Sequence, residues 1–205
     1  MSGVIGAGKT TLVRALSPLL GAHGVVERFE EDPYFEAFYT APERWALPHL
    51  LFFFEQSLTD QVRTRHDYAV TIQERPPQEH LAVFGAEFHA RGYLSDDNWA
   101  LVSRLGATCD LLAERSALIV HIDVAPAEAL ERLKQRARPE ESGISIGYLE
   151  SLTRRYDALL SGWPPSAVLT LAADDYDFRR AEDVARIAKL VSKRLSSEPA
   201  KALPL

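Results

Sequence analysis

The sequence has very little cysteine and no long apolar run, and both features limit what the protein can be. Cys109 is the single cysteine in 205 residues and cannot form a disulfide within the chain, which fits a reducing cytoplasm. No stretch approaches the roughly 18 consecutive apolar residues that a membrane span needs. The first residues lack the basic segment and apolar core of a signal peptide. We therefore expect a cytoplasmic protein without a membrane segment.

An excess of positive charge is also missing. Lys and Arg number 23 against 29 Asp and Glu, a formal net charge of −6, so broad electrostatic binding to nucleic acid is not expected. The hydrophobic fraction of 46% is that of an ordinary globular protein. The length favours one domain. We expect this domain to cover residues 1–195 and to be followed by a frayed tail at 196–205.

Short apolar runs alternate with segments of helical length. The runs are typical of strands buried on both faces, and they lie at 24–27, 68–72, 117–122 and 167–171. Helical patterns cover 11–20, 42–65, about 79–112, 126–136, 146–161 and 181–195. This alternation predicts an α/β fold, in which helices flank both faces of a parallel sheet.

A phosphate-binding loop is predicted near the start of the chain. The pattern G-x-x-x-x-G-K-[ST] is matched by Gly3, Val4, Ile5, Gly6, Ala7, Gly8, Lys9 and Thr10. The backbone N–H groups of such a turn surround phosphate oxygens, and the helix that opens with Thr11 adds its positive end. Lys9 is expected to reach the β- and γ-phosphates of ATP or another nucleoside triphosphate, and the Thr10 hydroxyl to hold Mg²⁺.

A buried strand normally precedes such a loop, yet only Met1 and Ser2 stand before Gly3. Two expectations follow. Either the native start lies upstream of Met1, which we favour, or the sheet lacks a full strand at what is usually its centre.

Four further segments carry residues suited to phosphoryl transfer. They are Val26-Glu27 with the aromatic stretch up to Tyr39, Trp45-Ala46-Leu47-Pro48, Ile72-Gln73-Glu74-Arg75, and the arginine-rich stretch 132–142. In this order and spacing they resemble the deoxynucleoside kinase family, and the resemblance runs from Gly3 to about Phe178. It implies a P-loop kinase fold with an arginine-rich lid.

The resemblance also implies catalytic roles for three residues at the carboxyl ends of predicted strands. Glu27 would accept the proton of the substrate 5′-hydroxyl, since a general base must lie beside that group. Glu74 would lie near Mg²⁺ and the same hydroxyl, while Arg75 would steady Glu27 and the phosphoryl oxygens. Pro76 replaces the serine that usually follows this arginine. The alternatives are a solvated carboxylate at Glu27 and a structural ion pair at Glu74 and Arg75.

A local basic cluster resembles the family lid. Arg132 and Arg136 are four residues apart and share a helix face, and Arg138 lies just beyond. Planar guanidinium groups suit phosphate oxygens, so all three are expected to contact ATP, with Arg136 acting in catalysis. The alternative is a solvated basic helix end. The segment that resembles the loop contacting the ATP adenine contains Asp175, Tyr176, Asp177 and Phe178.

Acceptor recognition is where the sequence departs from the family pattern. The resemblance assigns Tyr39 and Glu141 to the sugar 3′-hydroxyl and Phe84 to stacking on the base. Leu50 and His80 stand where relatives place a glutamine and an aspartate that read the base. A wrong base is rejected mainly because it leaves buried polar groups unpaired, so the loss of both polar side chains predicts a broad base preference. The preference is expected to lean toward purines, because the larger ring gains more from stacking on Phe84.

The sequence therefore predicts an ATP-dependent kinase that phosphorylates the 5′-hydroxyl of a deoxynucleoside for nucleotide salvage, and the resemblance implies a homodimer. Two alternatives remain. One is another small P-loop kinase, such as one that acts on nucleoside monophosphates. The other is a non-catalytic P-loop NTPase that uses Asp123, after the apolar run 118–122, as a metal residue.

Overall fold

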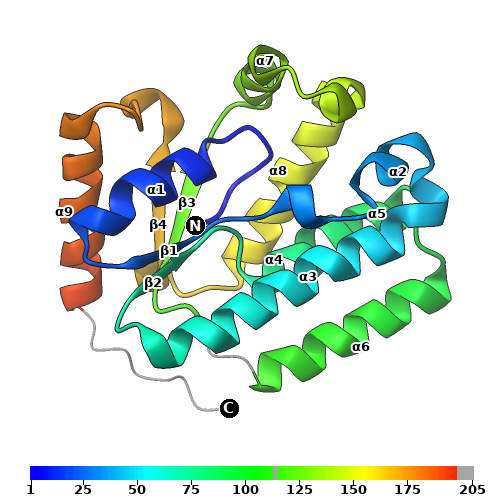
Figure 1. The fold of residues 1–205 in the computed structure, drawn as a ribbon, viewed down its shortest axis with the longest axis horizontal. Coiled ribbons are helices and arrows are strands. Elements are labelled where there is room, and N and C mark those ends of the chain that lie inside the picture. The colour runs from blue at the N-terminus through cyan, green and yellow to red at the C-terminus, as the bar shows by residue number, and fades with distance from the viewer. Residues whose placement is uncertain (113–114, 198–205) are drawn as a thin grey trace.

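Four short parallel strands form the centre of the molecule. The computed structural model describes residues 1–112 and 115–197. Two parallel pairs are formed by β1 (His23–Val25) with β2 (Thr71–Gln73), and by β3 (Ile119–Asp123) with β4 (Val168–Ala172). Figure 1 shows both pairs between the two groups of helices.

Met1 and Ser2 join the two pairs. The Met1 amino group donates to the Gln73 carbonyl at 2.7 Å, and the Arg75 amide donates to the Met1 carbonyl at 2.9 Å. On the other side, Ser2 makes a parallel bridge to His121. The order across the sheet is thus β1, β2, residues 1–2, β3 and β4. In place of the full central strand that was expected to be missing, these two residues bond to β2 on one side and to β3 on the other.

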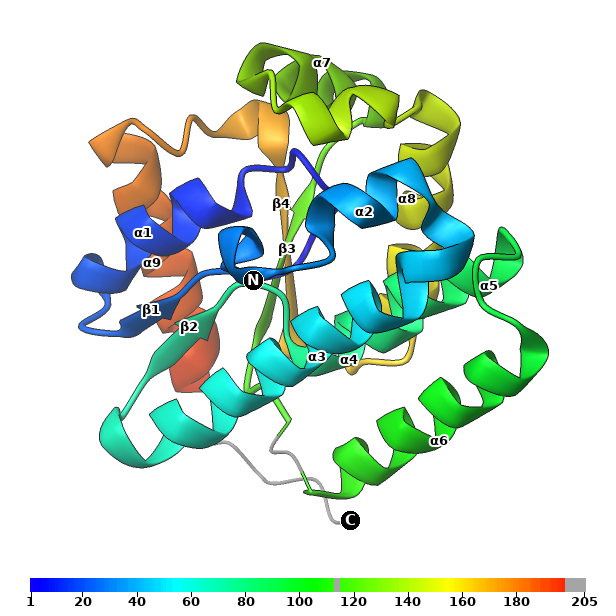
Figure 2. The ribbon, with the colours of Figure 1, turned by 45° about the vertical axis from the view of Figure 1, so that its right-hand side comes forward.

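Helices cover both faces of the strands. Helices α1 (Lys9–Leu19) and α9 (Ala181–Ser197) pack together on one side in both views (Figures 1 and 2). The other side carries α3 (Pro42–Asp67) and α8 (Ile146–Ser161), and α6 (Asp96–Leu112) lies at the outer edge of this group. The predicted α/β fold with helices on both faces is confirmed.

The remaining elements are short. The α-helices among them are α2 (Phe35–Thr40), α4 (Pro77–Glu79), α5 (Ala86–Ala90) and α7 (Pro126–Arg136). The 3₁₀ turns are η1 (Phe29–Glu31), η3 (Pro139–Gly143), η4 (Pro165–Ala167) and η5 (Ala173–Asp175). A π-helical segment, η2, covers His80–Gly85.

Local signals explain where α7 begins and ends and where α8 begins. Pro126 occupies the first turn of α7, where its missing N–H costs nothing. That helix ends at Ala137, which adopts a left-handed conformation (φ 53°), and Pro139 follows. Ser145 caps α8, because its hydroxyl accepts a hydrogen bond from the Tyr148 amide at 3.2 Å. Both helices have the bounds that the sequence predicted.

The prediction of a single helical stretch over residues 79–112 is wrong. The π-helical η2 interrupts it first, and Gly92 (φ 75°) then provides the left-handed residue that ends α5. The short helix α2 was not predicted. Strands β1 and β2 are three residues each and shifted by one to three residues from the predicted runs.

The end of the predicted domain also differs slightly. Helix α9 extends to Ser197, two residues past the predicted boundary at 195, and the rest of the predicted tail lies outside the described residues. Among the helices that the structure describes, none is both long and apolar enough to cross a membrane.

Candidate active site

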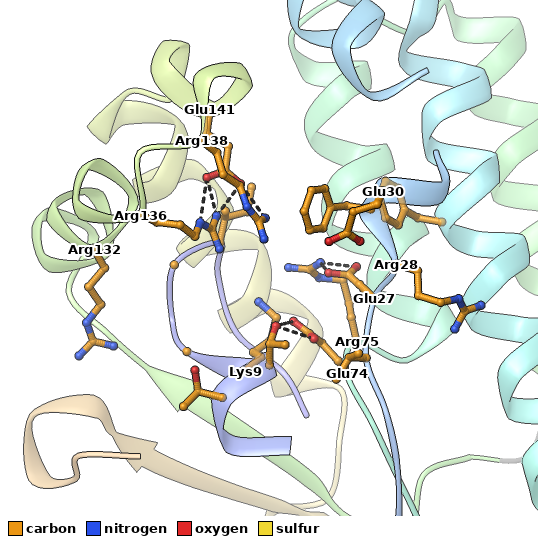
Figure 3. A pocket seen from close by; sticks show the side chains of 18 of the residues that line it. Lys9, Glu27, Arg28, Glu30, Glu74, Arg75, Arg132, Arg136, Arg138 and Glu141 are labelled. Atoms are coloured by element: carbon orange, nitrogen blue, oxygen red, sulfur yellow. Dashed lines mark hydrogen bonds and ion pairs between the residues drawn. The ribbon is translucent and has the colours of Figure 1, made fainter. Parts of the chain in front are cut away.

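One cavity of about 980 Å³ collects most of the predicted site residues. It extends from the phosphate loop, past the ends of β1 and β2 and under α7, to an aromatic end on α3 and η2. Figure 3 shows that the labelled side chains of the loop, the strand ends and the lid face a shared space. Because parallel strands place their carboxyl ends at one edge, ligands of α/β proteins bind there.

The phosphate loop has the backbone shape that its glycines allow. Gly6 (φ 85°) and Gly8 (φ 96°) are left-handed, and a Cβ atom on Gly6 would lie 2.7 Å from the Ala129 carbonyl oxygen. Only glycine fits there without displacing backbone. The Lys9 ammonium points into the loop and donates to the carbonyl oxygens of Gly3 and Val4, both at 2.9 Å. The loop thus presents N–H groups and a cation to an anion.

Lys9 is the only titratable group of the loop, and its surroundings weaken its hold on the proton. The residue is 4% exposed. Burial, with Arg75 as the next cause, lowers the pKa of Lys9 to about 8. A phosphate would supply the missing negative charge, so this lysine fits an anion site better than it fits a structural role.

Thr10 and Glu74 meet at the predicted metal position. The Thr10 hydroxyl donates to the Glu74 carboxylate, at 2.8 Å to Oε2 and 3.0 Å to Oε1. Hydroxyl and carboxylate oxygens are the ligands that Mg²⁺ prefers. The residues present therefore fit a Mg²⁺ ion that also contacts the nucleotide phosphates. No cluster of three or more His, Cys, Asp or Glu side chains suited to a metal occurs in residues 1–112 and 115–197.

Glu27 and Arg75 form an ion pair in the middle of the cavity (Figure 3). Glu27 lies two residues beyond β1 rather than inside the strand, and Arg75 follows Glu74 after β2. Arg75 adopts a positive φ of 56°, which is uncommon for a residue with a side chain. Local strain of this kind persists only where surrounding contacts fix it, and it concentrates at functional sites.

Two buried residues that the sequence analysis did not single out hold Arg75. Its Nε atom donates to the Tyr156 hydroxyl at 3.4 Å and lies 3.9 Å from Glu79 Oε2. Tyr156 in turn donates to Glu79 at 3.1 Å, and both side chains are almost fully buried. A Glu four residues after Arg75 at a helix start was a visible signal for such a pair. Tyr156 gave no signal beyond its place on the apolar face of α8.

The lid arginines make pairs with carboxylates of their own segment. Arg136 contacts both Glu141 oxygens, at 2.5 and 3.1 Å, and Arg138 lies 3.4 Å from Glu141 Oε1. Arg132 pairs with Glu128 and donates to the Ala7 carbonyl at 3.2 Å, so it lies against the phosphate loop. Figure 3 shows Arg136 and Arg138 together at Glu141, apart from Arg132.

Most of the predicted nucleotide and substrate residues line the cavity, and a few do not. In addition to those described above, the lining includes Ile5, Thr11, Tyr39, Leu50, His80, Phe84, Tyr176, Asp177 and Phe178. Val4 and Ala7 turn their side chains into the hydrophobic core, and Gly3 and Asp175 also lie outside the lining. Phe84 carries the Arg75 guanidinium at 4.6 Å over its ring, so one of its faces is already covered.

The residue proposed for the non-catalytic alternative lies elsewhere. Asp123 ends β3 with an exposed side chain and is not among the residues that line the cavity. In contrast, His49, next to Leu50 on α3, lines the cavity. Its position one residue from the expected base-reading place was the available signal.

This fold and site define a P-loop kinase. The sequence matches the family model "Deoxynucleoside kinase" over residues 1–196, so the chain belongs to the deoxynucleoside kinase family. It is 30% identical to a deoxyadenosine kinase of Dictyostelium discoideum over 78% of this chain and 65% of that protein. It is 27% identical to a deoxyadenosine/deoxycytidine kinase of Bacillus subtilis over 89% of this chain and 85% of that protein.

The fold is also that of a solved member of the family. The structure of a deoxyadenosine kinase from M. mycoides with bound dATP superimposes with a TM-score of 0.75 at 20% identity, over 93% of this chain and 97% of that one. The sequence-based prediction of a deoxynucleoside kinase is confirmed, and the family favours it over a monophosphate kinase or a non-catalytic NTPase.

Proposed function

We propose that this kinase transfers the γ-phosphoryl group of ATP, bound with Mg²⁺, to the 5′-hydroxyl of a deoxynucleoside. The observation that carries the proposal is the continuity of the cavity, which joins Lys9, the Glu27–Arg75 pair and the aromatic end. A donor phosphate at the loop and a nucleoside with its base at the aromatic end would meet beside Glu27.

On the donor side, the loop amides, Lys9 and Arg132 would hold the phosphates, and Tyr176 to Phe178 would contact the adenine. Thr10 and Glu74 would hold Mg²⁺, which neutralises charge on the β- and γ-phosphates when bound. The buried position of Lys9 supports this assignment, because a cation in a dry site acts strongly on a developing negative charge.

On the acceptor side, Glu27 would take the 5′-hydroxyl proton as the oxygen attacks phosphorus. Arg75 holds the Glu27 carboxylate in place and offers its remaining N–H groups to the phosphoryl oxygens. Glu79 and Tyr156 keep Arg75 oriented, so the pair acts through a fixed geometry.

Sugar recognition would rest on Tyr39 and Glu141. Burial, followed by the negative charge of Glu141, raises the pKa of Tyr39, so the phenol stays protonated and can donate. A tyrosine ring packed behind the sugar leaves little room for a 2′-hydroxyl, which would favour deoxyribose. Once the sugar binds Glu141, Arg136 would be released from that carboxylate to face the transferring phosphoryl group.

Two leucines on the surface of α6 support a homodimer. Leu101 is 59% exposed and Leu105 is 37% exposed, and their spacing places them on the same helix face. Because α6 lies at the outer edge of its helical group, a second copy can reach this face (Figures 1 and 2). The site residues come from one chain, so each subunit would act on its own substrate. A cytoplasmic location stays a prediction.

A phosphotransfer assay with ATP·Mg²⁺ tests the proposal. The acceptors are the four common deoxynucleosides and, in parallel, their 5′-monophosphates. We expect deoxynucleosides to give 5′-monophosphates and the monophosphates to give no diphosphate. Faster phosphorylation of the monophosphates, or ATP hydrolysis that no acceptor stimulates, would overturn it.

A further inference from the structure

The aromatic end of the cavity contains two imidazole rings in place of the amide and carboxylate that the family pattern predicts. His49 projects from α3, and His80 from the start of η2, into the same cavity. Phe53 lies near both imidazole rings, with ring centroids 5.1 Å from His49 and 6.0 Å from His80, so the imidazole nitrogens are polar groups set in an aromatic region. Leu50, the residue expected to read the base, is apolar and 2% exposed.

His80 faces the catalytic side of this space. Its Nε2 atom is buried, has no hydrogen-bond partner among the described residues, and lies 3.8 Å from Glu27 Oε1. Burial, with Arg75 as the next cause, holds the pKa of His80 well below its usual range, so the ring is neutral. A buried nitrogen without a partner in a cavity indicates that a ligand supplies the missing bond.

His49 is held by a buried carboxylate. Its Nδ1 atom lies 2.6 Å from Asp32 Oδ2, and the Asp32 side chain is 0% exposed. The other carboxylate oxygen, Oδ1, accepts from the Tyr34 amide at 2.9 Å. The ring stacks on Phe38 with centroids 4.2 Å apart and planes 4° apart, so it cannot rotate freely. Both oxygens of Asp32 are therefore occupied by donors, and the imidazole orientation is fixed.

This geometry determines which nitrogen of His49 carries the proton. A carboxylate only accepts hydrogen bonds, so Nδ1 must be the donor, and the tautomer with its single proton on Nδ1 presents a lone pair at Nε2. The side chain is 11% exposed and lines the cavity, whereas no partner for Nε2 is found among the described residues. The cavity thus offers a hydrogen-bond acceptor, in a fixed place, to whatever fills its aromatic end.

We propose that His49, oriented by Asp32, reads the base of the acceptor nucleoside through Nε2 and favours bases with an exocyclic amino group over their keto counterparts. The inference rests on the proposed function, since it needs a nucleoside in the cavity. It refines the broad base preference predicted from the sequence, because purine and pyrimidine amino groups satisfy one acceptor equally. The inference takes the exocyclic group of the base, and not the neighbouring ring nitrogen, to face Nε2; a keto oxygen in that place leaves Nε2 and the keto oxygen as two acceptors without a donor.

The test compares kcat/KM within two matched pairs of acceptors, deoxyadenosine against deoxyinosine and deoxycytidine against deoxyuridine. Each pair differs only by exchange of an amino for a keto group and the accompanying ring proton. We expect the amino member to be favoured about ten- to a hundredfold in both pairs. This ratio needs no variant and does not depend on the fraction of active enzyme.

Two variants assign the preference to the Asp32–His49 pair. In Asp32→Asn the amide oxygen keeps the Tyr34 contact and the amide nitrogen donates to His49 Nδ1, which moves the ring proton to Nε2. Nε2 then becomes a donor, and the preference should reverse toward the keto bases. His49→Phe should bring the ratio to about one, because no polar group remains. His66→Phe, on the exposed end of the same helix, should keep the wild-type ratio.

Different results would overturn the base-reading role of His49 and the proposed kinase function. Equal rates or a keto preference in the wild-type protein would overturn the inference, as would an unchanged ratio in His49→Phe. Phosphorylation of no nucleoside at all would instead overturn the proposed function, and the base-reading role with it. Reversal in Asp32→Asn supports the inference specifically, since a merely structural pair would change the rates of both members alike.

Discussion

At the scale of single residues, Lys9 links nucleotide binding to pH. Without ligand it loses its proton as the pH rises through about 8, whereas a phosphate favours the charged ammonium. ATP binding at about pH 9 should therefore take up a fraction of a proton, and the affinity should fall as the pH rises above 8. Calorimetry in buffers with different ionisation enthalpies measures this uptake. Identical heats in all buffers would contradict the assignment, and Lys9→Met should abolish the uptake.

The residue types and their order in the chain were enough to predict which side chains gather, but not how they pair. Glu27, Glu74 and Arg75 were placed correctly at one sheet edge because parallel strands end there. The pairing of Arg136 with Glu141 was not predicted, since it depends on how Pro139–Gly143 folds back onto α7. The contact between His49 and Asp32 was not predicted either, because the two residues lie 17 positions apart in the sequence.

At the scale of elements, the phosphate loop depends on Gly6. Its positive φ and the nearby Ala129 carbonyl leave no space for a side chain, so Gly6→Ala must displace the loop or α7. We expect a loss of about 1–3 kcal/mol in stability and much weaker ATP binding. Thermal unfolding and ATP titration measure the two effects. Gly21→Ala is the matched control for strain, because its φ is also positive (60°) but no atom lies within 4 Å of the added Cβ. Equal ATP affinity in wild type and Gly6→Ala would contradict this view of the loop.

The lid helix α7 supplies a second prediction at this scale. Arg136 lines the cavity, whereas Lys134 is 61% exposed, pairs with Glu131 and is not among the lining residues. Arg136→Ala should lower kcat by a factor on the order of a thousand, as expected for an arginine that stabilises a transferring phosphoryl group. Lys134→Ala should stay near wild type. Equal losses in both variants would favour general electrostatic attraction over a specific lid.

Elements with strong local sequence signals at their ends were predictable, and elements without such signals were not. Prolines mark both ends of α7 and a serine marks the start of α8, and these helices have the predicted bounds. The π-helical turn at His80–Gly85 was not, since its extra residue per turn has no periodic signature in so short a segment. It matters for function, because this turn carries both His80 and Phe84 into the cavity.

At the scale of the whole molecule, the exposed face of α6 predicts assembly. Leu105→Glu should place a charge in an apolar interface and shift a dimer toward monomers. Light scattering coupled to size-exclusion chromatography measures the mass. Lys189→Glu, on α9 at the opposite side of the molecule, should not change it (Figure 1). A wild-type protein that is monomeric at micromolar concentration would contradict the homodimer.

The central claim is that Glu27 is the base in a cavity that joins donor and acceptor. Glu27→Gln keeps the size of the side chain and can still accept from Arg75, but it cannot take a proton. The most direct measurement is the rate of phosphoryl transfer from γ-labelled ATP·Mg²⁺ to a bound deoxynucleoside in a single turnover, with the nucleoside Kd determined separately. We predict a rate lower by about a hundredfold or more, with the Kd nearly unchanged. Full turnover in Glu27→Gln would contradict the account and make Glu74 the candidate base.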